Sequence, residues 1–180
     1  MGAKRALKPR QVWAIRFFLD QHQRLRDRAL FDLAIDSKLR GCDVVRMRIG
    51  DIVLGSHVRT RALVVQAKTG RPVQFELMAD ARASLLAWLE RRGGSLADYV
   101  FPSRTDHARP LSTRQYARLV AEWVNGIGLR REEYGTHSLR RTRPPSSTRR
   151  RAIFARCRSY SATPRLRIPC ATLASRSKTL

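Results

Sequence analysis

Cysteines and long apolar runs are what this sequence has least of. Its three cysteines, Cys42, Cys157 and Cys170, form no paired or metal-like spacing, so we expect neither disulfides nor zinc. No apolar run approaches the length of a transmembrane helix, and the N-terminal Met-Gly-Ala-Lys-Arg-Ala lacks the apolar core of a signal peptide. We therefore expect a cytoplasmic protein with no membrane partner.

Acidic residues are also scarce. The 180 residues contain 14 Asp and Glu against 37 Lys and Arg, a formal net charge of +23 and a pI near 11.7. This excess predicts a polyanionic partner, with nucleic acid favoured over a membrane surface. Residues 143–180 carry ten of the basic residues and no acidic one. We expect one folded domain at 1–142 and a basic tail at 143–180, largely disordered or out of frame.

The hydrophobic periodicity changes twice along the chain. Helical spacing predicts helices over 9–22, 25–37 and 79–91, a short one within 39–47, and one from its N-cap Ser112 to about Gly126. Alternating spacing predicts strands over 60–66 and 72–77, joined by a loop at 68–71, with 52–54 as a candidate third strand. The order predicts a mainly α domain with a small antiparallel β-sheet insert, an α+β fold.

One motif near the end of the predicted domain suits an anion. The spacing His137-x-x-Arg140 puts both side chains on one face of a helix. Thr136 stands where a helix N-cap would, so backbone N–H groups would add to the same site. Such a pair can hold a phosphate, although the spacing alone also fits a capped, solvated helix start.

Three motifs in order carry a family resemblance. Leu39-Arg40-Gly41-Cys42-Asp43 comes first, then a hairpin bearing Lys68, then His137-x-x-Arg140. With the Phe-Pro-Ser loop at 101–103, this order resembles the catalytic domain of tyrosine recombinases, the phage integrase family, from about Pro9 to Thr142. The resemblance implies a recombinase catalytic-domain fold, double-stranded DNA as a partner, and other recombinase subunits as further partners.

The resemblance also implies a role for each motif residue. Arg40 and Arg140 would stabilise charge on the attacked phosphate, because guanidinium forks do this better than ammonium groups. Lys68 would donate a proton to the departing 5′-oxygen. His137 would hold the phosphate or exchange the nucleophile's proton, and Asp43 would support the first arginine. No metal or other cofactor enters this scheme.

Each residue also has an ordinary interpretation. Arg40 fits a charge at a helix C-terminus, and Lys68 fits a turn lysine. Tyr116 and Trp123 fit the core, and His57 and His107 fit surface loops. Six further arginines suit either phosphate contacts or a solvated face: Arg46, Arg48, Arg71, Arg104, Arg114 and Arg118.

The family pattern fails after Thr142. The resemblance implies an apolar helix, a Gly-His pair and a nucleophilic tyrosine about 30 residues past the second arginine, but Pro144 and Pro145 would interrupt a helix here. Tyr160 lies 20 residues past Arg140 without amphipathic periodicity, so we do not expect it to be the nucleophile. We expect this chain, as written, neither to cleave nor to join DNA.

A shifted reading frame explains this break. With permitted codons, residues 152–165 can be reread as Asn-Leu-Arg-Ala-Val-Gln-Val-Leu-Leu-Gly-His-Thr-Lys, and a tyrosine can straddle Ala171 and Thr172. We therefore hypothesise a frameshift, in the gene or in its reading, near residues 142–143.

Three functions compete at this point. The first is a site-specific recombinase or integrase that is inactive as written. The second is a non-enzymatic DNA-binding remnant, and the third is a basic RNA-binding protein, although the aromatic-studded sheet of common RNA modules is missing. We also expect the chain to lack the separate N-terminal helical domain of many family members, and to be nucleoid-associated through DNA.

Overall fold

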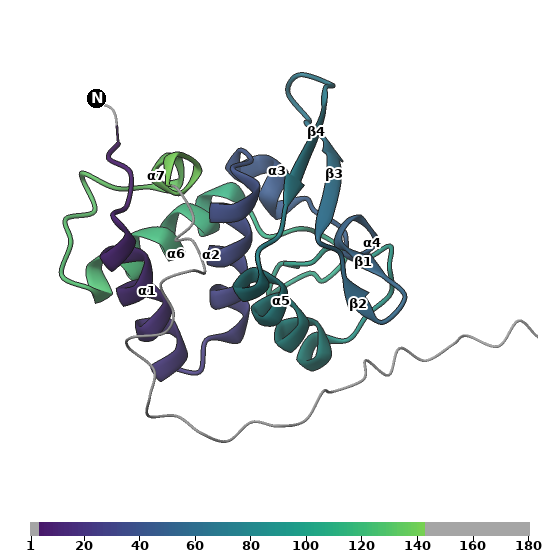
Figure 1. The fold of residues 1–180 in the computed structure, drawn as a ribbon, viewed down its shortest axis with the longest axis horizontal. Coiled ribbons are helices and arrows are strands. Elements are labelled where there is room, and N and C mark those ends of the chain that lie inside the picture. The colour runs from purple at the N-terminus through teal and green to yellow at the C-terminus, as the bar shows by residue number, and fades with distance from the viewer. Residues whose placement is uncertain (1–3, 143–180) are drawn as a thin grey trace, which may run out of the picture.

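The computed structural model describes residues 4–142. The expectations for the tail, Tyr160, Cys157 and Cys170 lie outside the described residues. In chain order the elements are α1 (Pro9–Gln21), α2 (Leu25–Ser37), α3 (Gly41–Val45), α4 (Ile49–Ile52), β1 (Val53–Leu54), β2 (His57–Val58), β3 (Arg61–Val65), β4 (Pro72–Glu76), α5 (Ala79–Arg92), α6 (Thr113–Gly126) and α7 (Thr136–Arg141). The predicted mainly α fold with small antiparallel sheets is confirmed (Figure 1).

Helix α2 is the centre of the core. Its residues 29–37 are all buried, and it contacts α1, α5 and α7. Its last nine residues need neighbours on every side, because burial reaches all round the helix. Polar residues are buried there too, and the least exposed is Asp32, whose carboxylate accepts hydrogen bonds from Nε of Arg16 at 2.7 Å and Nε of Arg28 at 2.8 Å. These ion pairs offset the cost of burying its charge.

The β segment forms two separate sheets. The candidate third strand pairs as β1 with β2, and β3 pairs only with β4, both antiparallel. The candidate strand at 52–54 is thus confirmed as β1 (Val53–Leu54), but it pairs with β2 and not with the hairpin. The reason is local: residues 49–52 fold as α4, where the side chain of Asp51 accepts the backbone N–H of Arg48 at 2.8 Å. His57, expected in a loop, lies exposed in β2.

Helix α7 begins one residue earlier than predicted. Its N-cap is Gly135, whose N–H donates to Oγ of Ser138 at 3.1 Å, and Thr136 is already the first helical residue. The predicted N-cap role of Thr136 is therefore wrong. The sequence alone does not decide which residue caps this helix, because residues 136 and 138 both have side-chain hydroxyls.

Residues 4–8 form a strap across α7. The backbone N–H of Leu7 donates to Oγ1 of Thr142 at 3.0 Å, and that hydroxyl donates to the carbonyl of Ser138 at 2.7 Å. The N–H of Arg5 donates to the carbonyl of Glu133 at 2.9 Å. The strap therefore holds α7 at both ends.

Among the described residues, no helix is long and apolar enough to cross a membrane.

Candidate functional site

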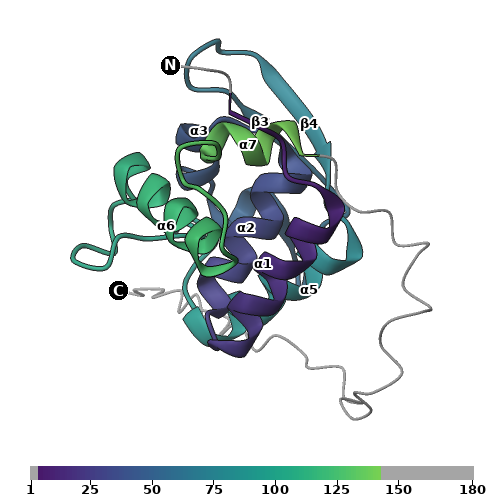
Figure 2. The same cartoon turned by 90° about the vertical axis from the view of Figure 1, so that its left-hand side faces the viewer.

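The predicted motif residues lie at one end of the molecule. In two perpendicular views, α3, α7 and the β3–β4 hairpin gather at the same end, with the hairpin projecting beyond the helices (Figures 1 and 2). Each motif came from a distant part of the chain, so the fold is what assembles them.

Arg140 is fixed against the end of α2. Its Nε donates to the carbonyl oxygen of Lys38 at 3.0 Å. Lys38 is the C-cap of α2 in the left-handed conformation, with φ of +52°. That turn points its carbonyl toward α7 and redirects the chain into Arg40, two residues later.

Arg40 lies at the start of α3, beside the other two motifs. It is the half-buried N-cap of that helix, and its Nη1 donates to Oε1 of Gln66 at 3.3 Å. Gly41 follows, and a Cβ built there would lie 3.2 Å from the ring of Tyr116 and 4.0 Å from Cβ of Thr136. Glycine thus allows α3 to approach α6 and the first residue of α7 closely.

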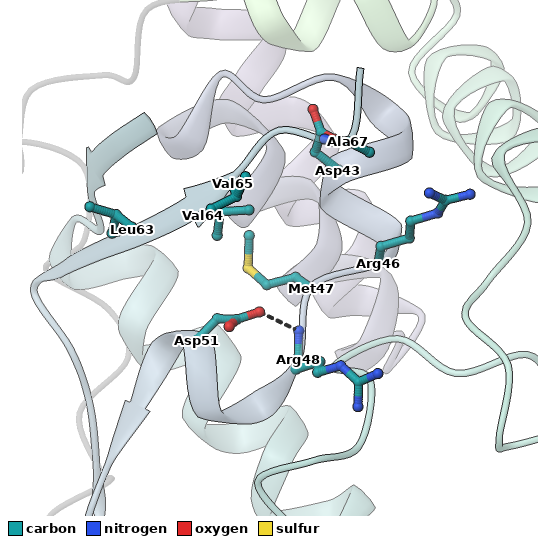
Figure 3. A pocket seen from close by; sticks show the side chains of 9 residues that line it. All are labelled: Asp43, Arg46, Met47, Arg48, Asp51, Leu63, Val64, Val65 and Ala67. Atoms are coloured by element: carbon teal, nitrogen blue, oxygen red, sulfur yellow. Dashed lines mark hydrogen bonds between the residues drawn. The ribbon is translucent and has the colours of Figure 1, made fainter. Parts of the chain in front are cut away.

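Asp43 bonds to the hairpin. Its side chain is only 3% exposed, and Oδ1 accepts the backbone N–H of Ala67 at 3.0 Å. Figure 3 shows the two residues together at one end of a pocket of about 340 Å³ that β3 borders. Within residues 4–142, no direct hydrogen bond or ion pair joins Asp43 to Arg40, so the expected support of that arginine stays a prediction.

Lys68 and His137 have exposed side chains. Lys68 lies in the turn between β3 and β4, directly after Ala67, and His137 lies in the first turn of α7. The backbone of Lys68 follows Ala67, which bonds to Asp43, and the backbone of His137 belongs to α7. In the described part of the chain, neither side chain has a hydrogen-bond partner.

The three cationic side chains of the motifs, Arg40, Lys68 and Arg140, carry uncompensated charge. Across residues 4–142, none of Arg40, Lys68, His137 and Arg140 pairs with a carboxylate. Several arginines elsewhere are paired with a carboxylate: Arg16 and Arg28, for example, share Asp32. Each guanidinium at this end donates only to a neutral oxygen, so its remaining N–H groups are free for an anion.

The six additional arginines divide into two groups. Arg48 is engaged locally, with Nη1 donating to the carbonyl of Ala97 at 2.5 Å and its guanidinium 5.0 Å above the ring of Tyr99. The other five are exposed and form no ion pair within the described residues: Arg46, Arg71, Arg104, Arg114 and Arg118. The core assignment of Tyr116 and Trp123 is confirmed, at 1% and 0% exposed.

Sequence reasoning missed Lys38 and Gln66. Both act through oxygens that accept from a motif arginine. Nothing in their spacing marks them. The only signal for Gln66 was its place as the last residue of the predicted strand 60–66, two residues before the motif lysine.

The fold defines the class of this domain. It matches a crystal structure of XerA recombinase with a TM-score of 0.63 and 15% identity, covering 78% of this chain and 49% of that one. It also matches lambda integrase residues 75–356 bound to DNA, with a TM-score of 0.58 and 23% identity, covering 78% and 50%. The domain therefore has the fold of a tyrosine recombinase catalytic domain.

The sequence comparisons agree with the fold. The model of the phage integrase family matches residues 5–143. Tyrosine recombinase XerC of Xanthomonas campestris pv. campestris (strain B100) is 37% identical over 84 residues. That alignment covers 47% of this chain and 25% of the relative. The chain belongs to the phage integrase family, which confirms the resemblance.

Proposed function

We propose that this domain binds double-stranded DNA as part of a site-specific recombinase or integrase. The observation that carries the proposal is the convergence of the three motifs: Arg140 bonds to the end of α2, Arg40 bonds to the hairpin, and Gly41 of α3 lies near Thr136, the first residue of α7. Relatives in the same fold include XerH bound to its difH substrate and a lambda integrase tetramer bound to a Holliday junction. These support DNA and further recombinase subunits as partners, and nucleoid association through DNA.

The proposed chemistry is stabilisation of a DNA phosphate. Attack at phosphorus places negative charge on the non-bridging oxygens, and Arg40 and Arg140 would donate to them. Lys68 would give a proton to the 5′-oxygen as its bond to phosphorus breaks. His137 would donate to the phosphate or exchange the proton of the attacking hydroxyl. None of these steps uses a cofactor.

Salt-dependent DNA binding tests this proposal. Replacing Arg40 and Arg140 together with alanine removes two phosphate contacts, so the slope of log affinity against log salt should fall by about 2. The matched control is Arg91→Ala, an exposed arginine at the end of α5, combined with Arg109→Ala, whose guanidinium pairs with Asp106. Equal slopes for the two double variants would contradict the proposal. Comparing slopes matters because the basic tail adds the same background to every variant.

We further propose that this chain is inactive as written. The family match ends at residue 143, where the sequence stops following the family pattern. Without a nucleophilic tyrosine, the phosphate site can bind and polarise a phosphodiester but cannot form a covalent protein–DNA link. A frameshift near residues 142–143 accounts for the break. Sequencing the coding DNA tests it, because one shifted frame must encode both the Gly-His pair and the later tyrosine.

The second candidate is a non-enzymatic DNA-binding module. The uncompensated cations favour it as much as they favour an enzyme. The two candidates predict different results when both motif arginines are removed from an intact relative that carries the same site. Loss of strand exchange supports the enzyme. Weaker, salt-sensitive binding with strand exchange retained supports the module.

A further inference from the structure

Hydrogen bonds hold the turn that carries Lys68 on both sides of that residue, one to the body of the protein and one within the turn. Before it, the N–H of Ala67 donates to buried Asp43 at 3.0 Å. After it, Oγ1 of Thr69 donates to Oε1 of Gln66 at 2.9 Å. A projecting hairpin loop would otherwise cost entropy to hold in one conformation. Lys68 therefore has a free side chain on a fixed backbone.

Gln66 joins the second of these ties to Arg40. Its single side-chain oxygen accepts from both Thr69 and Nη1 of Arg40, at 2.9 Å and 3.3 Å. Its backbone closes the turn as well, because its carbonyl accepts from Gly70 at 2.8 Å and its N–H donates to Arg71 at 3.0 Å. One residue thus contacts both the first motif arginine and the turn of the motif lysine.

An amide suits this position better than a carboxylate. A glutamine oxygen orients the guanidinium but leaves its charge available, whereas a glutamate would neutralise it. Arg40 spends one of its five N–H donors on Gln66 and keeps the others. The arrangement fixes Arg40 without competing with an anion for its charge.

We propose that Gln66 is a positioning residue that couples Arg40 to the Lys68 turn. The inference rests on the proposed function, since it assigns a partner role within the same phosphate site. Gln66 does not touch the reacting atoms. It sets the position of Arg40 relative to the turn, so that a change at either one is felt at the other.

Hydrogen exchange on the DNA-free full-length chain tests the coupling directly. Gln66→Ala should speed exchange of the Ala67 amide about tenfold, because the turn loses its tie to Arg40. Arg40→Ala should do the same although it lies on another element, and adding it to Gln66→Ala should cause no further change. Gln74→Ala, an exposed glutamine on β4 without a side-chain hydrogen bond among the described residues, is the matched control. Urea unfolding verifies that each variant folds.

Binding to a short DNA duplex gives the second readout. Arg40→Ala and Lys68→Ala should lower affinity non-additively in the native background and additively when Gln66 is alanine. Gln66→Glu should lower the salt slope by about 1, because the new carboxylate pairs with Arg40. Unchanged exchange in Arg40→Ala, or additivity in both backgrounds, overturns the inference and leaves the proposed function intact. Full affinity in both single variants overturns the proposed function, whatever the exchange shows.

Discussion

Nε of Arg140 donates to the carbonyl oxygen of Lys38, although the two residues are 102 positions apart in the sequence. The bond ties α7 to the end of α2, two residues before Arg40. The acceptor is available because Lys38 adopts a left-handed backbone, which turns its carbonyl away from the helix axis. The bond thereby places Arg140 beside the chain segment that leads into Arg40.

Replacing Arg140 with lysine should weaken DNA binding although the charge is kept. Arginine can donate from Nε to the Lys38 carbonyl while its terminal nitrogens contact a phosphate, whereas lysine has a single ammonium group. Lysine also cannot donate two parallel hydrogen bonds to one phosphate. We expect about a tenfold loss of affinity for a short duplex at fixed salt. Arg91→Lys, at the exposed end of α5, should change the affinity less than about twofold, because single exposed charges contribute little. Equal losses in both would argue against a special role for Arg140.

Removing the Asp43 carboxylate should loosen the hairpin. Asp43→Ala leaves the N–H of Ala67 without its acceptor, and we expect a loss of about 1–3 kcal/mol in the free energy of unfolding. Proteolysis within residues 66–71 should also become faster. Asp51→Ala removes a comparable but more exposed side-chain bond, to Arg48 N–H, and should cost about 1 kcal/mol or less without affecting the hairpin.

The buried carboxylate of Asp32 should matter far more than an exposed one. Asp32→Ala leaves the largely buried guanidinium groups of Arg16 and Arg28 short of a partner, at a cost of about 3–5 kcal/mol. Glu76→Ala breaks the exposed pair with Arg61 and should cost less than about 1 kcal/mol. Urea unfolding of both variants measures the difference, and similar midpoints would contradict it.

Asp36 should make stability depend on pH. Burial, the largest cause, raises the pKa of its carboxyl from 3.8 to about 6, against the opposing hydrogen bond from Met78 N–H. Since the folded pKa exceeds the unfolded one, the stabilisation is fully present below about pH 4 and is lost as the pH rises through 6. Asp36→Asn removes this titration. Relative to the native chain, the variant should therefore gain up to about 3 kcal/mol between pH 4 and pH 7.

A second carboxylate provides the control of opposite sign. The pKa of Asp98 is lowered, chiefly because the backbone N–H of Ser95 donates to it at 2.8 Å. Its stabilisation is present above the unfolded pKa and is lost as the pH falls. Asp98→Asn should therefore be less stable than the native chain at neutral pH, and this difference in the free energy of unfolding should shrink as the pH falls. A difference between Asp36→Asn and the native chain that does not vary with pH would contradict the assignment of the Asp36 shift to burial.

Incubation with a suicide DNA substrate should yield no covalent adduct. The expectation follows from the proposal that this chain lacks the nucleophilic tyrosine, since Tyr160 lies only 20 residues past Arg140 in a stretch without amphipathic periodicity. Denaturing electrophoresis detects such an adduct, and an intact relative run in parallel verifies the substrate. An adduct mapped to Tyr160 would refute the prediction.

The long helices were predictable because their apolar spacing reports burial directly. The predicted 9–22 and 25–37 compare with Pro9–Gln21 and Leu25–Ser37 in the structure. The separate β1–β2 sheet was not predictable, because a two-residue strand carries no period and α4 preceded it unrecognised. The motif residues were found by type and order. Lys38 and Gln66 were not, because a carbonyl or an amide acquires its role only when the fold brings an arginine to it.

The strap over α7 makes the two ends of the described domain mechanically one piece. Leu7 and Thr142 meet at a single hydroxyl, and that hydroxyl also closes the last turn of the helix bearing His137 and Arg140. A displacement of the strap would therefore move this helix as well. A movement of residues 4–8 would thus also change the orientation of the proposed phosphate site.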